Sequence, residues 1–114
     1  MADVTITAVG RVNQVGFYGD CMQTLAVFFK KDQDNASLVP PGERVKVLLT
    51  INGSVYHAGL RTTEKMPSIK LCPDLIDENG GEVRLVDILL GMGIQNKSNV
   101  SLAIVGLTVT LDPA

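Results

Sequence analysis

The chain has 114 residues, 46% of them hydrophobic and 4% aromatic, which is enough apolar material for one core built mainly on valine, leucine and isoleucine. The formal net charge of −2 argues against a general nucleic-acid or membrane-surface binder, since such proteins are usually basic. The first residues show no signal-peptide pattern, and no apolar run approaches the roughly 18 residues of a membrane span. The sequence therefore predicts a single-domain cytoplasmic protein without membrane contact, whose thiols Cys21 and Cys72 are free.

The first 43 residues contain two segments with strand patterns, each followed by a polar stretch. Apolar and polar residues alternate over residues 3–9, which predicts a strand with one buried face. Residues 13–20 carry two glycines and are expected to form a loop. Residues 21–30 are dense in apolar side chains and could be a strand buried on both faces or a short helix. Residues 32–43 end in Pro-Pro-Gly and are expected to be a loop.

The strongest local signal in the chain is a β-hairpin. Two strand-like runs, residues 44–51 and 54–61, flank the dipeptide Asn52-Gly53. Asn-Gly adopts the positive φ angles that a two-residue type I′ turn requires. Because this turn fixes the register, we expect the first residue of one run, Arg44, to lie opposite the last residue of the other, Arg61.

This register divides the hairpin into two faces. One face is apolar and is expected to line the core; it comprises Val45, Val47, Leu49, Ile51, Ser54, Tyr56, Ala58 and Leu60. The other face carries three cations and the only histidine of the chain; it comprises Arg44, Lys46, Leu48, Thr50, Val55, His57, Gly59 and Arg61. Like charges directly opposite each other cost about 0.2–1 kcal/mol, so the two arginines predict an anion nearby.

The next segments predict a strand, a turn and a helix. Residues 67–73 form a short strand bounded by prolines, which is expected near a sheet edge. Residues 74–81 are acidic and are expected to be a turn or a single helical turn. Apolar residues at helical spacing predict a helix over residues 83–92, ended by Gly91 or Gly93.

The longest strand signal covers residues 100–111, after a turn at residues 96–99. Its apolar phase slips by one residue at Val105-Gly106, which is typical of a β-bulge. Bulged strands bend and can close barrels. The predicted fold is therefore mainly β: a small open or closed barrel, or pseudobarrel, of about six strands with one short helix, with a sandwich as the alternative.

No combination of residues predicts catalysis, a metal site or a cofactor. Residues 32–43 have the spacing of a calcium loop but lack its third oxygen ligand and its turn glycine. Cys21 and His57 carry no signature of a thiol-based catalytic site. The acidic residues of 74–78 are typical of a solvated surface, and Gly91-Met92-Gly93 ends a helix and does not form a dinucleotide loop. We therefore expect a protein that is not an enzyme.

The outward face of the hairpin is the best candidate for a binding site. Glu43 and Glu64 flank Arg44 and Arg61 and could neutralise them within the chain. Alternatively, these cations contact phosphates, with nearby hydroxyl groups as further donors. The candidate residues for binding nucleic acid or another anion are Arg44, Lys46, His57, Arg61, Thr63 and Lys65, with Thr50 as an additional hydroxyl donor.

The order of elements over just over half of the chain resembles that of the DNA-binding pseudobarrels, which include the EcoRII-type effector domains of restriction endonucleases and a plant transcription-factor domain. The shared order is a strand, a tight turn, a strand ending in basic and hydroxyl residues, a short proline-bounded strand, a helical segment and a terminal strand. These elements are Val45–Ile51, Asn52-Gly53, Tyr56–Thr63, Pro67–Leu71, Val83–Leu90 and Val100–Val105. The resemblance implies sequence-specific binding of duplex DNA through two loops or arms on a concave sheet face, without a cofactor.

The sequence thus favours a non-catalytic binding module, with duplex DNA as the first candidate partner. A second hypothesis is a barrel that binds a small ligand or a protein partner, through the acidic residues 74–87 or the mouth of the barrel. A third is a homo-oligomeric subunit that associates through an exposed strand such as residues 100–111.

Overall fold

The computed structural model describes residues 5–18, 22–32, 35 and 37–114, with the side chains of residues 15–18 and 22–24 outside the description. The described residues form nine strands and one helix. They are β1 (Thr5–Tyr18), β2 (Met22–Lys30), β3 (Arg44–Ile51), β4 (Ser54–Arg61), β5 (Ser68–Leu71), β6 (Asp74–Ile76), β7 (Glu82–Arg84), α1 (Leu85–Gly91), β8 (Asn99–Val105) and β9 (Thr108–Pro113).

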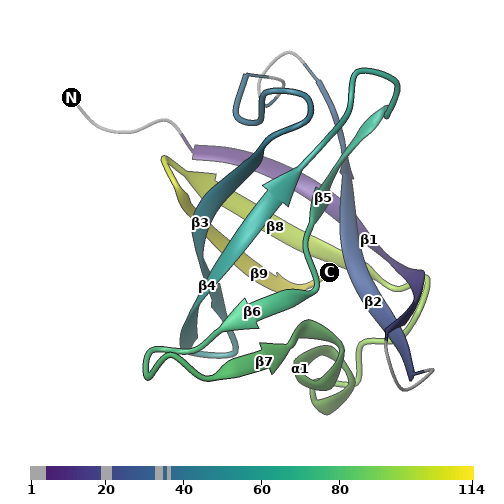
Figure 1. Cartoon of the computed structure of the whole chain (residues 1–114), viewed down its shortest axis with the longest axis vertical. Coiled ribbons are helices and arrows are strands. Elements are labelled where there is room, and N and C mark those ends of the chain that lie inside the picture. The colour runs from purple at the N-terminus through teal and green to yellow at the C-terminus, as the bar shows by residue number, and fades with distance from the viewer. Residues whose placement is uncertain (1–4, 19–21, 33–34, 36) are drawn as a thin grey trace.

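Seven of the described strands close into a barrel, in the order β3-β9-β8-β1-β2-β5-β4, with β4 pairing back onto β3. Strands β3 and β9 run parallel, which joins the middle of the chain to its last strand, and the other neighbours in the ring are antiparallel. Strands β6 and β7 extend from β4 and lead into α1 at one end of the barrel (Figure 1). The prediction of a mainly β barrel with one short helix is confirmed.

The predicted hairpin is present, with the predicted register in every pair from the turn to Arg44 opposite Arg61. The φ angles are 51° at Asn52 and 79° at Gly53, as a type I′ turn requires. The predicted core face points inward except at Ser54, which is exposed beside the turn. Val47, Leu49, Ile51, Ala58 and Leu60 are buried, and Val45 and Tyr56 are half-buried.

The first strand is longer than its alternation predicts. It runs from Thr5 to Tyr18. The prediction of a loop over residues 13–20 is therefore wrong for residues 13–18, and residues 19 and 20 lie outside the described part of the chain. β1 pairs with β8 over its first half and with β2 over its second, and its register with β2 shifts between Gln14 and Phe17. A glycine within a strand often marks such an irregularity, and Gly16 lies inside this shift. Residues 22–30, left open between strand and helix, form the strand β2.

The short strand β5 is not at an edge. It lies between β2 and β4 in the ring, so the edge position predicted from its prolines is wrong. Pro67 and Pro73 both fall outside the four residues of the strand, Ser68–Leu71, and therefore remove no donor from its hydrogen-bonded ladder.

The acidic residues 74–81 form more than the predicted turn. They begin with the strand β6, which pairs with β7. The turn that follows is organised by Asp77, whose carboxylate accepts hydrogen bonds from the backbone N–H groups of Asn79 and Gly81 at 2.9 and 2.8 Å. Asp77 is therefore explained by the fold.

The predicted helix is shorter than the spacing suggested. It covers Leu85–Gly91 and ends at Met92, after which Gly93 takes a φ of 78°. Val83 belongs to β7 and not to the helix. The buried face of α1 packs against β2, which closes one end of the barrel.

The strand predicted over residues 100–111 is a second hairpin, β8–β9, and the predicted bulge is wrong. Its turn is Gly106-Leu107, with Val105 paired to Thr108 and a φ of 58° at Gly106. A two-residue turn and a one-residue bulge shift the alternation of inward and outward residues in the same way. The phase of the apolar residues alone could not separate them.

The interior of the barrel is filled by apolar side chains from all seven strands of the ring. Fully buried members include Val12, Phe29, Leu49, Leu60, Leu71, Leu102 and Leu111, and α1 adds Leu85 and Leu89. Because residues alternate between the two faces of each strand, the remaining side chains form the outer wall. The predicted site residues on the strands lie on this wall.

Candidate nucleic-acid interface

The outward face of the hairpin has the predicted composition. Arg44, Lys46, Leu48, His57 and Arg61 are all exposed, and Thr50 and Val55 are half-buried. Gly59 is the exception, because it is buried beneath a neighbouring side chain. The face is therefore open to solvent except where Arg44 crosses it.

Arg44 is neutralised within the chain, but not by the residues expected. Its side chain crosses Gly59, and its Nη1 donates a hydrogen bond to the Asp74 carboxylate at 2.8 Å. This hydrogen bond raises the pKa of Arg44 further. Glu43 and Glu64 are exposed and form no ion pair with any described residue, so the internal neutralisation predicted through these glutamates is wrong.

The cross-strand register carries the basic face well beyond the hairpin. Arg44 is opposite Arg61, Arg61 is opposite Lys70 on β5, and Lys70 is opposite Phe28 on β2. Phe28 is in turn opposite Arg11 on β1. All five residues lie on the outer wall of adjacent strands. We call Arg44, Arg61, Lys70 and Arg11 the cationic row, with Phe28 between its last two members.

The cationic row is compact and largely unpaired. Neighbouring strands lie about 4.8 Å apart, so the row covers roughly 19 Å of curved wall. Arg11 and Arg61 are exposed and Lys70 is half-buried, and none of the three forms an ion pair with another described residue. The row is therefore a line of four cations, three of which form no ion pair with a described residue.

Sequence reasoning missed Lys70, Phe28 and Arg11. The alternation of each strand could have placed them outward, since Lys70 stands between the buried residues Ile69 and Leu71. What was missing is the strand order, which is set by the closure of the barrel. Lys70, Phe28 and Arg11 belong to three different strands and no sequence spacing connects them.

The other predicted residues lie beside the row. Thr63 and Lys65 are exposed in the loop that follows β4. This loop is fixed at its base, where the buried Thr62 hydroxyl donates to the carbonyl oxygen of Ser68 at 2.8 Å. Lys31 Nζ donates to the carbonyl oxygen of Thr63 at 3.1 Å, which brings another cation to this end of the barrel.

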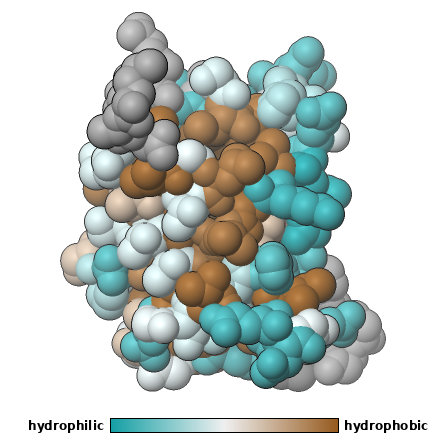
Figure 2. Space-filling model, turned by 90° about the vertical axis from the view of Figure 1, so that its left-hand side faces the viewer, coloured by the Kyte–Doolittle hydropathy of each residue, from teal (hydrophilic) through white to brown (hydrophobic). Residues whose placement is uncertain are grey.

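His57 does not belong to the row; its surroundings are apolar. It is opposite Leu48 on β3 and Ile76 on β6, and Leu48 is next to Thr108, which pairs with Val105. The exposed apolar residues of this region, which we call the apolar strip, are Leu48, Ile76, Val105 and Leu107, with 36% to 61% of their surface exposed. Figure 2 shows a band of hydrophobic residues running down this side of the molecule, flanked by hydrophilic surface.

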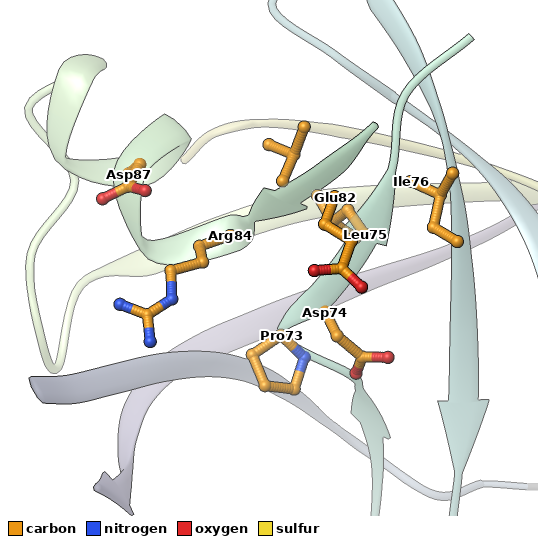
Figure 3. A pocket seen from close by; sticks show the side chains of 8 residues that line it. Pro73, Asp74, Leu75, Ile76, Glu82, Arg84 and Asp87 are labelled. Carbon is orange, nitrogen blue, oxygen red and sulfur yellow. The ribbon is translucent and has the colours of Figure 1, made fainter. Parts of the chain in front are cut away.

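The acidic residues of the segment 74–87 lie at the opposite end of the barrel from the loop of Thr63 (Figure 1). A pocket of about 610 Å³ lies on β6, β7 and the start of α1, and its charged lining residues are Asp74, Glu82, Arg84 and Asp87. Figure 3 shows Asp74 and Glu82 on one side of it and Arg84 and Asp87 on the other. With three carboxylates against one guanidinium, this pocket disfavours phosphate.

The described residues contain no group of three or more histidine, cysteine, aspartate or glutamate side chains that could hold a metal ion. Cys72 is a buried free thiol whose pKa is raised by burial, and Cys21 lies outside the described residues. In the calcium-like segment, Asp32 and Asn35 form reciprocal hydrogen bonds between side chain and backbone, and Asp34 lies outside the described residues. None of the described helices is long and apolar enough to cross a membrane.

Comparisons of the chain with protein-family models, with curated proteins and with solved structures found no match. The resemblance to DNA-binding pseudobarrels stays a prediction, and the site must be interpreted from its own geometry.

Proposed function

We propose that this protein is a non-catalytic nucleic-acid-binding barrel that contacts phosphates with its cationic row. The observation that carries the proposal is the register: Arg44, Arg61, Lys70 and Arg11 lie on one line across the outer wall. Phosphate contacts from arginine and lysine provide most of the affinity of proteins for nucleic acid. A line of cations can follow the phosphates of a nucleic-acid backbone.

The net charge of −2 does not contradict this proposal, because five of the twelve acidic residues lie in the segment 74–87. This segment forms β6, the turn after it, β7 and α1 and touches the row through the Arg44–Asp74 pair, whereas the row itself crosses β3, β4, β5, β2 and β1 (Figure 1). Exposed charges more than about 10 Å apart are largely screened at 0.1 M salt. The local field at the row therefore determines what binds there.

The test is fluorescence anisotropy with labelled DNA at about 50 and 200 mM salt. If the three unpaired cations Arg11, Arg61 and Lys70 each neutralise a phosphate, the logarithm of the binding constant for duplex DNA falls with the logarithm of salt at a slope of about −2.7. Replacing Arg61→Gln and Lys70→Gln together should reduce that slope by about 1.8. A loss of one charge outside the row, Lys97→Asn, should leave the slope unchanged.

Lys97 suits this control because its φ of 73° is a conformation that asparagine adopts readily. Binding that is independent of salt, or that the Arg61 and Lys70 replacements leave unaltered, would contradict the proposal.

The second candidate function is self-association through the apolar strip. The strip places four exposed large apolar side chains on neighbouring strands, with His57 between Ile76 and Leu48, and exposed apolar patches of this kind mark interaction sites. A second copy of the chain is the occupant that this strip fits, because a two-fold axis along it would set the apolar side chains of the two copies against each other.

The third hypothesis required an exposed strand at residues 100–111. Strands β8 and β9 each pair on both sides within the barrel, so their described residues offer no long open edge. Any association there is made by side chains and not by addition of a strand. A small ligand would instead use the charged pocket on β6 and β7.

A further inference from the structure

The outer wall beside the cationic row contains a shallow groove of about 500 Å³. It lies on β1, β2 and the start of β5, and its lining residues are Asn13, Gln14, Phe28, Phe29, Lys30, Pro67 and Ser68. Phe28 is outward and half-buried, since its neighbours Val27 and Phe29 fill the barrel interior. An aromatic side chain thus lies in a groove that also offers amide and hydroxyl groups.

The position of Phe28 between two cations of the row indicates what this groove can bind. Phe28 is directly opposite Lys70 on one side and Arg11 on the other. The two cations are therefore about 10 Å apart across the strands, with the aromatic side chain midway. Proteins that bind single-stranded nucleic acid combine cations that follow the backbone with aromatic side chains on which bases stack, and both kinds of group are present here.

We propose that the groove binds an unstacked base of single-stranded nucleic acid, which stacks on Phe28 while Arg11 and Lys70 contact the phosphates on either side. This inference rests on the proposed function and specifies its ligand. Asn13 and Ser68 line the same groove and provide donors and acceptors for the edge of the base. Lys30, which is opposite Ser68 and exposed, adds a further phosphate contact.

The geometry favours a single strand over a duplex for a physical reason. In a duplex the bases are paired and stacked, so Phe28 reaches one only if it is flipped out, at a cost of a few kcal/mol. A duplex can still contact the cationic row, but only through its phosphates. A single strand presents its bases to the groove without that cost.

The experiment compares three fluorescein-labelled probes of equal length by anisotropy: an oligo(dT), an oligo(rU) and a mixed-sequence DNA duplex. Either single strand should bind more tightly than the duplex, and the tighter of the two identifies DNA or RNA as the source of the base. Phe28→Ala should weaken binding of the single strand by roughly 5- to 150-fold and leave duplex binding unchanged. Leu90→Ala, which removes an exposed apolar side chain on α1, is the matched control.

Two further measurements keep the test decisive. Phe28→Leu keeps the apolar volume without the aromatic face, and it should lose single-strand affinity even if Phe28→Ala fails to fold. The fluorescence of a 2-aminopurine in the single strand should be quenched on binding to the natural chain but not to Phe28→Leu. Circular dichroism of each variant confirms that the barrel is intact.

The outcomes separate the two proposals. Equal affinity for single strand and duplex, or an equal loss of both in Phe28→Leu, would overturn the base-binding groove and leave phosphate binding by the row in place. Absence of salt-dependent binding to all three probes would overturn both. Tighter single-strand binding that depends on an aromatic residue at position 28 would establish the groove.

Discussion

Arg44 and Asp74 form an ion pair of 2.8 Å that connects the first residue of β3 to the first residue of β6 across the backbone of Gly59. The pair explains how Arg44 can lie opposite Arg61: the Arg44 side chain turns away from the other arginine and over the glycine. Gly59 permits this path because it has no side chain. The arrangement holds one cation of the row against the acidic end of the molecule.

Gly59→Ala should break this ion pair while leaving the barrel folded. A Cβ atom at position 59 would lie 2.9 Å from Arg44 Cγ and would overlap the guanidinium group, so the Arg44 side chain must move outward. The pair is exposed to solvent, with 34% and 69% of the two side chains accessible, and such pairs contribute at most about 1 kcal/mol. We expect a loss of less than about 1 kcal/mol in the free energy of unfolding. A larger loss in urea denaturation would show that Arg44 packing is structural.

Asp74→Asn should increase affinity for nucleic acid. The change removes the carboxylate that holds Arg44, which is then available for a phosphate contact. One additional phosphate contact should make the salt slope for duplex DNA steeper by about 0.9. Glu78→Gln is the control, because it removes the same charge from an exposed turn outside the row. Equal effects of the two variants in anisotropy titrations would mean that only the overall charge matters.

The local structure of this protein could be predicted where short-range rules determine it. Asn52-Gly53 fixed the register of the hairpin, and the alternation around it separated core from surface correctly. The short-range rules failed where the secondary structure of a segment depends on the strands with which it pairs. β1 continues through its glycines because it is hydrogen-bonded to β8 and β2. The turn of the second hairpin is Gly106-Leu107, which lacks the Asn-Gly sequence that marks the first.

The candidate site shows the same division. Each outward residue of the hairpin could be predicted, because the Asn52-Gly53 turn alone fixes the register of both strands. Asp74 as the partner of Arg44, and Lys70, Phe28 and Arg11 as neighbours of Arg61, depend on the order of strands around the ring. Long-range strand order follows from closure of the barrel, and a single sequence contains no local pattern that specifies it.

Gly53→Ala should lower stability and Gly91→Ala should not, although both add a methyl group in open space. Gly53 has a φ of 79°, a conformation that costs an L-residue about 1–2 kcal/mol, so its replacement should lower the urea midpoint. Gly91 is the last residue of α1 and its φ is not positive, so alanine should be neutral or stabilising by up to about 1 kcal/mol. Destabilisation of similar size at both positions would argue against a left-handed turn at Gly53.

The Cys72 thiol should be unreactive in the folded protein and should make stability sensitive to alkaline pH. Burial raises its pKa above that of an unfolded cysteine, about 8.5, although the charge of Arg44 opposes the shift. Folding therefore favours the neutral thiol. The contribution of the neutral thiol to the free energy of unfolding is complete below about pH 8.5 and is lost as the pH rises through the folded-state pKa.

In a Cys21→Ser background, we expect slow reaction of Cys72 with a thiol reagent at neutral pH and a fall in the urea midpoint above about pH 8.5. Replacing Cys72 by alanine should reduce that fall. If labelling of the native protein is as fast as that of the urea-unfolded chain, the thiol is not buried as described.

Self-association should depend on the apolar strip. Leu48 and Leu107 are adjacent on it, since the Leu48 N–H donates to the Leu107 carbonyl oxygen at 2.8 Å, and their side chains are 42% and 61% exposed. Replacing both by serine should shift the mass measured by light scattering from that of two chains to that of one. Val9→Ser, which changes a more exposed apolar residue on β1 outside the strip, should leave the mass unchanged. A natural chain that is monomeric at high concentration would refute self-association. The proposal of nucleic-acid binding would be unaffected by that result, because the cationic row lies on other positions of the wall.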